Sequence, residues 1–547
     1  MNENFKFKDL KYIRPDFDKV KAEFSSLTEK MKNATSYEDA KKIYREFEAV
    51  SSDVQDAYTI VMIRHTVDTR DKFYDDENEY FSAVSPEISP YIVEFYNALY
   101  DGKFRNDFEG EFGAQMMRSI ELERKFFTEK NIPLQQQEAK LCNEYEKIIA
   151  SAAIDFNGEK LNLYGVMKFF EDNDRKVRKA AWDKYAEFFA ANEKRFEEIW
   201  DELIMVRNEQ GRNLGYENYI PLGYARQGRT DYNAADVASF REQVREELVP
   251  LCNELYLAQA KRIGVDKVCA YDENYVFEGG NAVPVGNDDE LVEIARGMYK
   301  DMSKETGEFI DFMIDHELLD LKNKPGKAAT GYMTSIEKYK APFVFSCFNG
   351  TTGDIQVLTH ELGHAFAGYE AMRNQPITAY YSESTDIAEI HSMSMEQFSY
   401  PYAERFFGDK ADKFRFQHLQ EAITFVPFGV AVDEYQHIVY SKPDLTPKER
   451  TAEWKKLEEK YMPWRDYGDI DFFARGGWWY HKIHIFLYPF YYINYTLTTM
   501  GAMEFKKKMH DDKISAWNDY MNLCKVGGSK SYLETLAYAN LSNPFRA

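Results

Sequence analysis

A five-residue motif, HELGH, constrains this chain more than any other feature of its sequence. It places His360, Glu361 and His364 within residues 352–371, whose apolar residues before and after the motif predict one buried helix. Side chains four residues apart lie on the same face of a helix, so the two imidazoles can bind one metal ion. Glu361 projects beside them, where it can take a proton from a metal-bound water. This HExxH arrangement is typical of zinc peptidases.

A catalytic zinc ion usually takes three protein ligands, so one more acidic residue or histidine must complete the site. Three glutamates are candidates. Glu370 lies on the same segment, but the turn glycine that such a ligand requires is replaced by Ala367. Glu383 lies in the loop-like stretch YYSES, and Glu389 lies within a helix predicted at residues 385–397. A helix holds a ligand more rigidly than a loop does, yet the residues alone leave the choice open.

The net charge and the cysteine content indicate which partners and which cellular compartment to expect for this protein. The net charge of -23 and the pI of about 5.1 argue against binding to nucleic acid or to anionic membranes. Five scattered cysteines without a CxxC pair indicate reduced thiols. The sequence shows no secretory signal, and its most apolar run, residues 485–493, is about half of the ~20 residues that span a bilayer. We therefore expect a cytoplasmic protein, and the sequence is silent on its oligomeric state.

Amphipathic helices dominate the predicted secondary structure. From residue 16 to about residue 212, apolar side chains recur at steps of three and four residues. A short hairpin with an Asn157–Gly158 turn interrupts them, and residues 344–348 resemble a strand that leads into the metal helix. Such a strand edge could bind an extended peptide or could only cover the core. Further helices are expected at residues 409–426, 435–441 and 478–500.

A stripe of aromatic and histidine residues lies near the C-terminal end of the chain. His484, Tyr488, Tyr491 and Tyr495 are spaced four, three and four residues apart, so they share one face if residues 478–496 are helical. An imidazole and phenols that face the zinc could donate hydrogen bonds to a developing oxyanion. Aromatic stripes are more often core packing, and Pro489 would kink this helix. The residues alone leave both interpretations open.

The HELGH motif, with FNGTTGD before it and ESTDIAEIHSMSME after it, resembles the thimet oligopeptidase and oligoendopeptidase F family, especially the latter branch. The resemblance extends from about Leu203 to the C-terminal end and includes LGYARQGR and HIFLYPFYYINY. It implies that Glu389 is the third metal ligand and that Glu396 holds a ligating histidine. His391 points to another side of the same helix and is expected to pack in the core.

The resemblance also implies that a C-terminal histidine and tyrosines face the zinc. His484 matches the family histidine, and among Tyr488, Tyr491, Tyr492 and Tyr495 we favour Tyr491 and Tyr495. His481, one turn earlier, is a second candidate for the histidine. Two arginines could bind a substrate carboxylate, although an ion pair is the commoner role; they are Arg226 and Arg475.

The expected fold is mainly α, with two helical lobes that enclose a deep substrate channel and a small β-sheet next to the HExxH zinc helix. Residues 1–200 are expected to form the N-terminal lobe, and residues 201–547 the catalytic region. The resemblance implies an intracellular peptidase with one Zn²⁺ ion that cuts internal bonds of short peptides. In that reading Glu361 is the general base, and His484 with Tyr491 stabilises the tetrahedral intermediate. The alternatives are a zinc carboxypeptidase or dipeptidyl carboxypeptidase, and a peptide-binding protein with a vestigial metal site.

Overall fold

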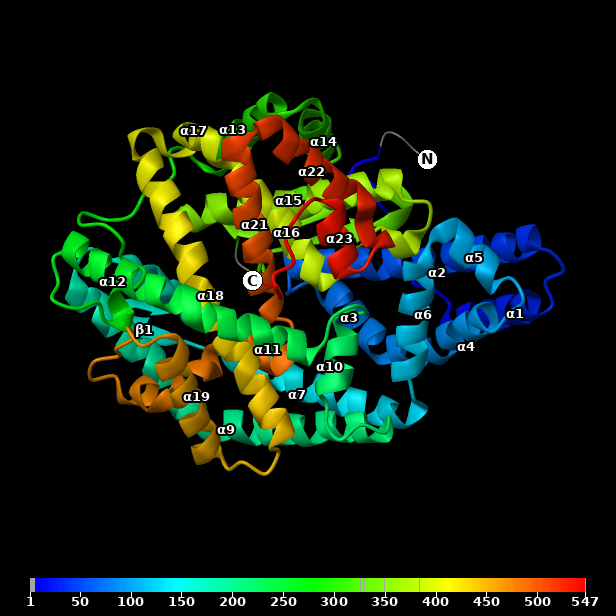
Figure 1. The fold of residues 1–547 in the computed structure, drawn as a ribbon, viewed down its shortest axis with the longest axis horizontal. Helices are drawn as coiled ribbons and strands as arrows, with labels where there is room; N and C mark the ends of the chain where they lie inside the picture. Colours follow the sequence, from blue (N-terminus) through cyan, green and yellow to red (C-terminus); the bar gives the residue numbers. More distant parts are fainter. Residues whose placement is uncertain (1–4, 325, 329, 349, 383, 547) are drawn as a thin grey trace.

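Two hydrophobic cores organise the molecule. The structure, a computed structural model, describes residues 5–324, 326–328, 330–348, 350–382 and 384–546. The smaller core contains buried side chains from Phe17 to Ile120, together with Ile377 and Tyr380. The helices of this core are α1 (Phe17–Lys32), α2 (Tyr37–Val67), α3 (Lys72–Val84), α4 (Ser89–Tyr100), α5 (Arg105–Phe112) and α6 (Ala114–Phe126). Figure 1 shows α1, α4 and α5 at one end of the molecule and α3 nearer its middle.

The larger core takes its side chains from most of the remaining chain, including α7 and α9. The predicted lobe boundary at residue 200 stays a prediction, although the smaller core ends well before it. The helices that surround the larger core before the metal helix are α7 (Ile132–Ala150), α8 (Leu163–Met167), α9 (Arg175–Asn213), α10 (Ile220–Arg226), α11 (Ala234–Gln243), α12 (Val249–Ile263), α13 (Asp288–Met302) and α14 (Lys304–Asp315).

The C-terminal half contains the predicted metal helix and the helices that pack around it. Figure 1 shows α15, α16 and α21 in the middle of the molecule. The helices of this half are α15 (Thr352–Asn374), α16 (Thr385–Ser399), α17 (Ala403–Phe407), α18 (Ala411–Ser441), α19 (Pro447–Tyr461), α20 (Ile483–Leu487), α21 (Ile493–Asp511), α22 (Lys513–Val526) and α23 (Tyr532–Tyr538).

Two small sheets complete the fold. The predicted hairpin is present as β1 (Ile154–Phe156) and β2 (Glu159–Leu161), and both Asn157 and Gly158 have the positive φ angles that its tight turn requires. A second sheet has the order β3-β5-β4, with β3 (Leu319–Lys322) parallel and β4 (Tyr332–Ile336) antiparallel to β5 (Ala341–Phe348). The fold class is confirmed, because helices dominate and a small sheet adjoins the HExxH helix.

Three of the predicted elements were wrong in detail. Residues 409–426 and 435–441 belong to one helix, α18, which continues through Pro427. Residues 478–500 are not one helix, since a 3-10 turn, the five-residue α20 and a turn precede α21. Pro489 explains part of this break, because a residue before proline is driven out of the helical region, and Tyr488 has φ -129° and ψ 65°. The strand predicted at residues 344–348 is the central β5, and its partners were missed because both are short.

Candidate active site

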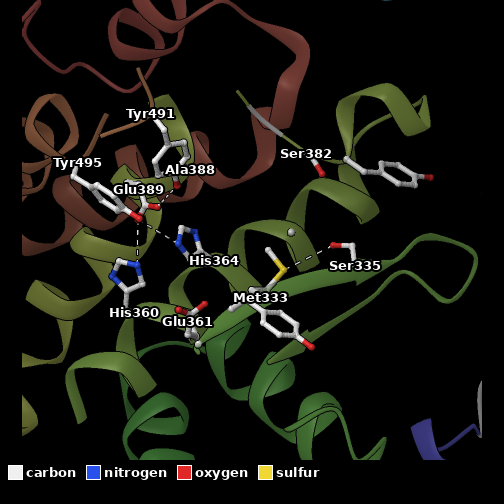
Figure 2. Close-up of a pocket in the computed structure, with 14 residues that line it drawn as sticks. Met333, Ser335, His360, Glu361, His364, Ser382, Ala388, Glu389, Tyr491 and Tyr495 are labelled. Atoms are coloured by element: carbon white, nitrogen blue, oxygen red, sulfur yellow. Dashed lines mark hydrogen bonds and ion pairs between the residues drawn. The ribbon is translucent and has the colours of Figure 1, made fainter. Parts of the chain in front are cut away.

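Helices α15 and α16 bring the three predicted metal ligands together. The imidazole rings of His360 and His364 on α15 lie 4.9 Å apart and nearly perpendicular. Oε2 of Glu389 on α16 lies 3.1 Å from Nε2 of His360 and 3.4 Å from Nε2 of His364. One ligand atom from each residue lies within 4.8 Å of the others. Figure 2 shows the two imidazoles directed at this carboxylate.

A glycine inside the motif permits this approach of the two helices. A Cβ atom at Gly363 would lie 2.7 Å from Cα of Ser392 and 3.0 Å from the carbonyl oxygen of His391, both on α16. Any larger residue would therefore push α16 away from α15. The fourth residue of HELGH thus brings Glu389 within reach of the histidines.

The charge of Glu389 suits a metal ligand. Burial alone would raise the pKa of this carboxyl, but His364 and His360 hold its pKa well below the ordinary value. The carboxylate is therefore ionised at neutral pH. Its Oε2 also accepts a hydrogen bond from Oγ of Ser392 at 3.0 Å, and its Oε1 accepts one from the Tyr491 phenol at 2.8 Å.

A second glutamate orients the first histidine. Oε1 of Glu396 lies 2.6 Å from Nδ1 of His360, so the Nε2 atom of the same ring is directed to the metal position. The other carboxylate oxygen of Glu396 is hydrogen-bonded to His418, and Tyr400 in turn contacts Nδ1 of His418 at 2.6 Å. Glu396 therefore makes the contact with His360 that the resemblance implied, and its role in supporting a metal ligand stays a prediction.

Glu361 lines the same cavity as the three ligands. The cavity has a volume of about 350 Å³ and opens between α15, α16 and β4. Burial raises the pKa of the Glu361 carboxyl, while the neighbouring imidazoles of His360 and His364 lower it. A carboxylate with a raised pKa next to a metal position is suited to accept and return a proton.

The edge strand β4 forms one wall of this cavity. Gly331, Tyr332, Met333 and Ser335 all line it, and the Met333 and Ser335 side chains lie opposite the histidines in Figure 2. Among the described strands β4 pairs with β5 alone, so its other edge has no strand partner there. The prediction that residues 344–348 provide such an edge was wrong, because β5 is the central strand and β4 lies at the edge.

The predicted aromatic residues divide between two cavities. Tyr491 and Tyr495 line the cavity with the metal ligands, and Tyr495 also lines a neighbouring cavity of about 360 Å³. His484 and Tyr492 line only the second cavity, although the His484 ring stacks on Tyr491 with centroids 5.9 Å apart. Tyr488 is 52% exposed and lines neither cavity.

Protonation states differ across this aromatic group. Burial, followed by the charge of Lys482, lowers the pKa of His484 to about 3, so its imidazole is neutral at pH 7. Burial and the nearby Glu389 raise the pKa of the Tyr491 phenol, and the pKa of Tyr495 is raised for the same reasons. Both phenols therefore stay protonated and can donate hydrogen bonds.

The other candidates that the structure describes do not join the metal cluster. Glu370 is hydrogen-bonded to Asn374, and Glu383 lies outside the described residues. His391 contacts the carbonyl oxygen of Leu523, as expected for a packing residue. His481 contacts the carbonyl oxygen of Trp478 and lines neither cavity. The two arginines form ion pairs, Arg226 with Glu138 at 3.0 Å and Arg475 with Glu193 at 2.6 Å.

Three parts of the site were not predicted from the sequence. The strand β4 carries no run of β-branched residues that would have predicted it. His418, which supports Glu396, lies 22 residues further along the chain, and a lone histidine on a helix has no signal of its own. Ser392 could have been found, because it lies three residues after Glu389 on the same helix.

Comparison with known proteins places this site in a family. The model of peptidase family M3 matches residues 168–283 and 307–547, and the model of the peptidase M3 N-terminal domain matches residues 7–127. The chain belongs to peptidase family M3. This M3 chain is therefore a peptidase, and both the HELGH helix and the tyrosine segment lie within the matched residues.

Individual relatives agree with the family. The structure of PZ peptidase A with an inhibitor is 44% identical to the M3 chain, has a TM-score of 0.96, and matches 99% of this chain and 96% of its own. The chromosomal oligoendopeptidase F of Lactococcus lactis subsp. cremoris is 22% identical over 96% of this chain and 90% of its own. An oligoendopeptidase F homolog of Borreliella burgdorferi is 21% identical over 77% and 72%. No helix among the described residues of the M3 chain is long and apolar enough to cross a membrane.

Proposed function

We propose that this M3 peptidase is a zinc-dependent oligoendopeptidase that hydrolyses internal bonds of short peptides. The observation that carries the proposal is the convergence of His360, His364 and Glu389 in a cavity that Glu361 also lines. Two neutral imidazoles and one carboxylate are a ligand set that catalytic zinc sites use. The names of the oligoendopeptidase F relatives support the choice of substrate class.

The spacing of the ligand atoms fits a zinc ion. Tetrahedral coordination with bonds of about 2.0–2.2 Å separates any two ligand atoms by roughly 3.3–3.6 Å. The distances from Glu389 Oε2 to the His360 and His364 Nε2 atoms are 3.1 Å and 3.4 Å. These side chains would therefore move little to bind a zinc ion. Glu396 fixes the ring of His360 so that Nε2 faces the ion.

The proton transfers are assigned to Glu361. When bound, the zinc ion polarises the scissile carbonyl and makes water a better nucleophile. Glu361 takes the proton of the attacking water and then passes it to the leaving amine nitrogen. The buried position of Glu361 supports this role, because burial raises its pKa toward the range in which a carboxylate can both accept and return a proton.

Tyr491, Tyr495 and His484 are proposed to stabilise the negative oxygen of the tetrahedral intermediate. The Tyr491 phenol donates to Glu389 and borders the metal cavity, so a modest rotation would direct it to a substrate oxygen. Tyr495 borders both cavities and is also protonated. His484 lines only the second cavity and stacks on Tyr491, so its contribution requires substrate to extend past that ring.

The edge of β4 is proposed to bind the substrate backbone. An extended peptide that pairs with this edge would pass over the metal ligands on the floor of the cavity. Backbone pairing selects little among sequences, which suits a peptidase that acts on many short peptides. A cavity of about 350 Å³ is too small to admit a folded protein. A cytoplasmic location remains part of the proposal, and the free thiols of Cys142, Cys252, Cys269 and Cys347 are consistent with it.

The test is mass spectrometry of the products from a mixed library of short peptides. Each peptide is supplied with a free and with an amidated C-terminus, and the protein is used as purified, after treatment with a chelator, and after zinc is returned. We expect cuts at internal bonds in both forms of each peptide, loss of cutting with the chelator, and recovery with zinc.

Two outcomes would contradict the proposal. Cleavage restricted to peptides with a free C-terminus, with release of single residues or dipeptides, would indicate a carboxypeptidase or dipeptidyl carboxypeptidase. Cleavage that survives removal of all metal would exclude the zinc mechanism. Stoichiometric zinc by metal analysis distinguishes the second result from incomplete chelation.

A further inference from the structure

The turn that carries Tyr491 has a strained backbone. Phe490 has a φ of +63°, and its side chain is fully buried. Residues with a Cβ atom rarely adopt this conformation, which persists only where the surrounding structure enforces it. Such positions cluster at active sites, so the contacts that hold Phe490 bear on the position of the neighbouring Tyr491.

Both backbone carbonyl contacts come from the segment LGYARQGR, residues 222–229, far away in the sequence, while the Phe490 N–H donates to Oε1 of Gln436 on α18 at 2.9 Å. Nε2 of Gln227 donates to the carbonyl oxygen of Pro489 at 3.2 Å. Nη2 of Arg229 donates to the carbonyl oxygen of Phe490 at 2.6 Å and to Oδ1 of Asn494 at 2.8 Å. Both carbonyls of the strained dipeptide thus accept hydrogen bonds from this one segment.

The same segment also leaves room for the Phe490 ring. A Cβ atom at Gly223 would lie 2.4 Å from Cδ2 of Phe490. The ring lies among the rings of Tyr219 and Tyr224, with centroids 6.3 Å and 5.5 Å away. Any side chain at residue 223 would therefore displace the ring and, with it, the turn.

Residues 222–229 further contact the first turn of α16, which bears Glu389. Oγ1 of Thr385 donates to Oε1 of Gln227 at 3.0 Å, and Nδ2 of Asn494 donates to Oγ1 of Thr385 at 2.9 Å. Glu389 follows Thr385 by one helical turn. Residues 222–229 therefore contact both the start of α16 and the turn that carries Tyr491. The helix and the turn also contact each other directly, where the Tyr491 phenol donates to Glu389.

We propose that Gly223, Gln227 and Arg229 are positioning residues that set the Tyr491 phenol against Glu389 and the scissile carbonyl. None of the three lines either cavity, so each acts through the turn and not on the substrate. The part of the proposal that concerns the scissile carbonyl rests on the proposed function. The placement of the phenol against Glu389 is independent of it.

The kinetic test compares Arg229→Lys and Gln227→Met with a matched control. Because small displacements of a catalytic group are costly, we expect kcat to fall about tenfold in both variants, with KM within about twofold and zinc content unchanged. The control is Arg178→Lys, since Arg178 is also a buried arginine that donates to backbone carbonyls and to a side-chain oxygen, but it contacts Asp172, Asn173 and Asp272. Its kcat should match that of the wild type.

The same substitutions are then placed in a Tyr491→Phe background. If residues 222–229 act through the Tyr491 phenol, Arg229→Lys and Gln227→Met should cause no further loss of kcat there. A full tenfold loss in that background would overturn the proposal. Gly223→Ala provides a third variant, and its predicted steric displacement of Phe490 should give the same pattern.

A readout without catalysis separates this proposal from the proposed function. The ¹⁹F resonance of 3-fluorotyrosine incorporated at position 491 is recorded in the full-length chain as purified, without substrate. We expect the resonance to shift in Arg229→Lys and Gln227→Met and to stay in place in Arg178→Lys. An unchanged resonance in the first two variants would overturn the positioning role. Absence of peptide cleavage by the wild type would instead contradict the proposed function, and the fluorine measurement would still decide the positioning.

Discussion

The two sides of the cavity are built in different ways. His360, His364 and Glu389 lie on two regular helices, α15 and α16, where spacing along the chain fixes the direction of each side chain. Tyr491 lies instead on a turn with a positive φ angle, held by side chains that are distant in the sequence. On the metal side each helix fixes the direction of its own ligands, and packing at Gly363 brings the two helices together, whereas the tyrosine turn itself is held by distant side chains. Substitutions on the two sides should therefore separate metal binding from catalysis.

Glu361→Gln should have the largest effect, because it removes the base and leaves the metal ligands in place. An amide cannot take a proton from water, so we expect kcat to fall about 10³-fold or more, with zinc content unchanged. Peptide turnover and metal analysis are measured on the same sample. Glu370→Gln is the matched control, a buried glutamate on the same helix that is hydrogen-bonded to Asn374 and should keep full activity. Turnover retained by Glu361→Gln would remove this residue from the mechanism.

Tyr491→Phe tests the other side of the cavity. Loss of one oxyanion donor costs about 10²-fold in kcat, and the zinc should stay bound because its three ligands are intact. Tyr488→Phe serves as the control, since this tyrosine is half exposed and lines neither cavity. Equal losses in the two variants would show that Tyr491 has no special role.

Glu396→Gln should weaken metal binding more than it slows the loaded enzyme. Glu396 orients His360, and loss of such a supporting group typically lowers metal affinity 10–100-fold. Competition with a chromogenic chelator measures this affinity. Glu421→Gln is the control, because Glu421 borders the second cavity but is hydrogen-bonded to Gln356 and Gln417. Unaltered zinc affinity in Glu396→Gln would contradict the role in orienting His360.

The smallest effect concerns stability and pH. The unfolded chain protonates His484 near pH 6.5, whereas burial and Lys482 lower its pKa to about 3 in the folded protein. The buried neutral imidazole therefore does not lower the free energy of unfolding above pH 6.5. As the pH falls from 6.5 toward 3, the free energy of unfolding decreases by about 1.4 kcal/mol per pH unit. The free energy of unfolding of His484→Asn is measured with denaturant between pH 6 and 4. Its slope against pH should be smaller than that of the wild type by this amount. An unchanged slope in His484→Asn would show that the imidazole is solvated in the folded protein and would contradict the prediction.

The sequence predicted the metal side because its signals are local. The spacing of His360 and His364 within one helix sufficed to predict that they share a face, and the structure shows that they do. The choice of Glu389 needed the family resemblance, because only the tertiary packing at Gly363 decides which glutamate reaches the histidines. Local spacing alone could not distinguish it from Glu370.

The tyrosine side could be predicted only in part. His484, Tyr488 and Tyr491 are spaced four and three residues apart, which suggested one helical face. The helix is interrupted before and after α20, so His484 and Tyr491 line adjoining cavities. The backbone around Phe490 is hydrogen-bonded to Gln227 and Arg229, which no local pattern connects to it. The edge strand β4 was missed for a similar reason, since its pairing with β5 defines it more than its own residues do.

X-ray diffraction from crystals of the zinc-loaded protein, with data collected above and below the zinc absorption edge, tests the central claim most directly. The account predicts a single anomalous peak within about 2.0–2.2 Å of Nε2 of His360, Nε2 of His364 and a carboxylate oxygen of Glu389. A peak elsewhere in the molecule, or stoichiometric zinc that does not contact Glu389, would contradict it.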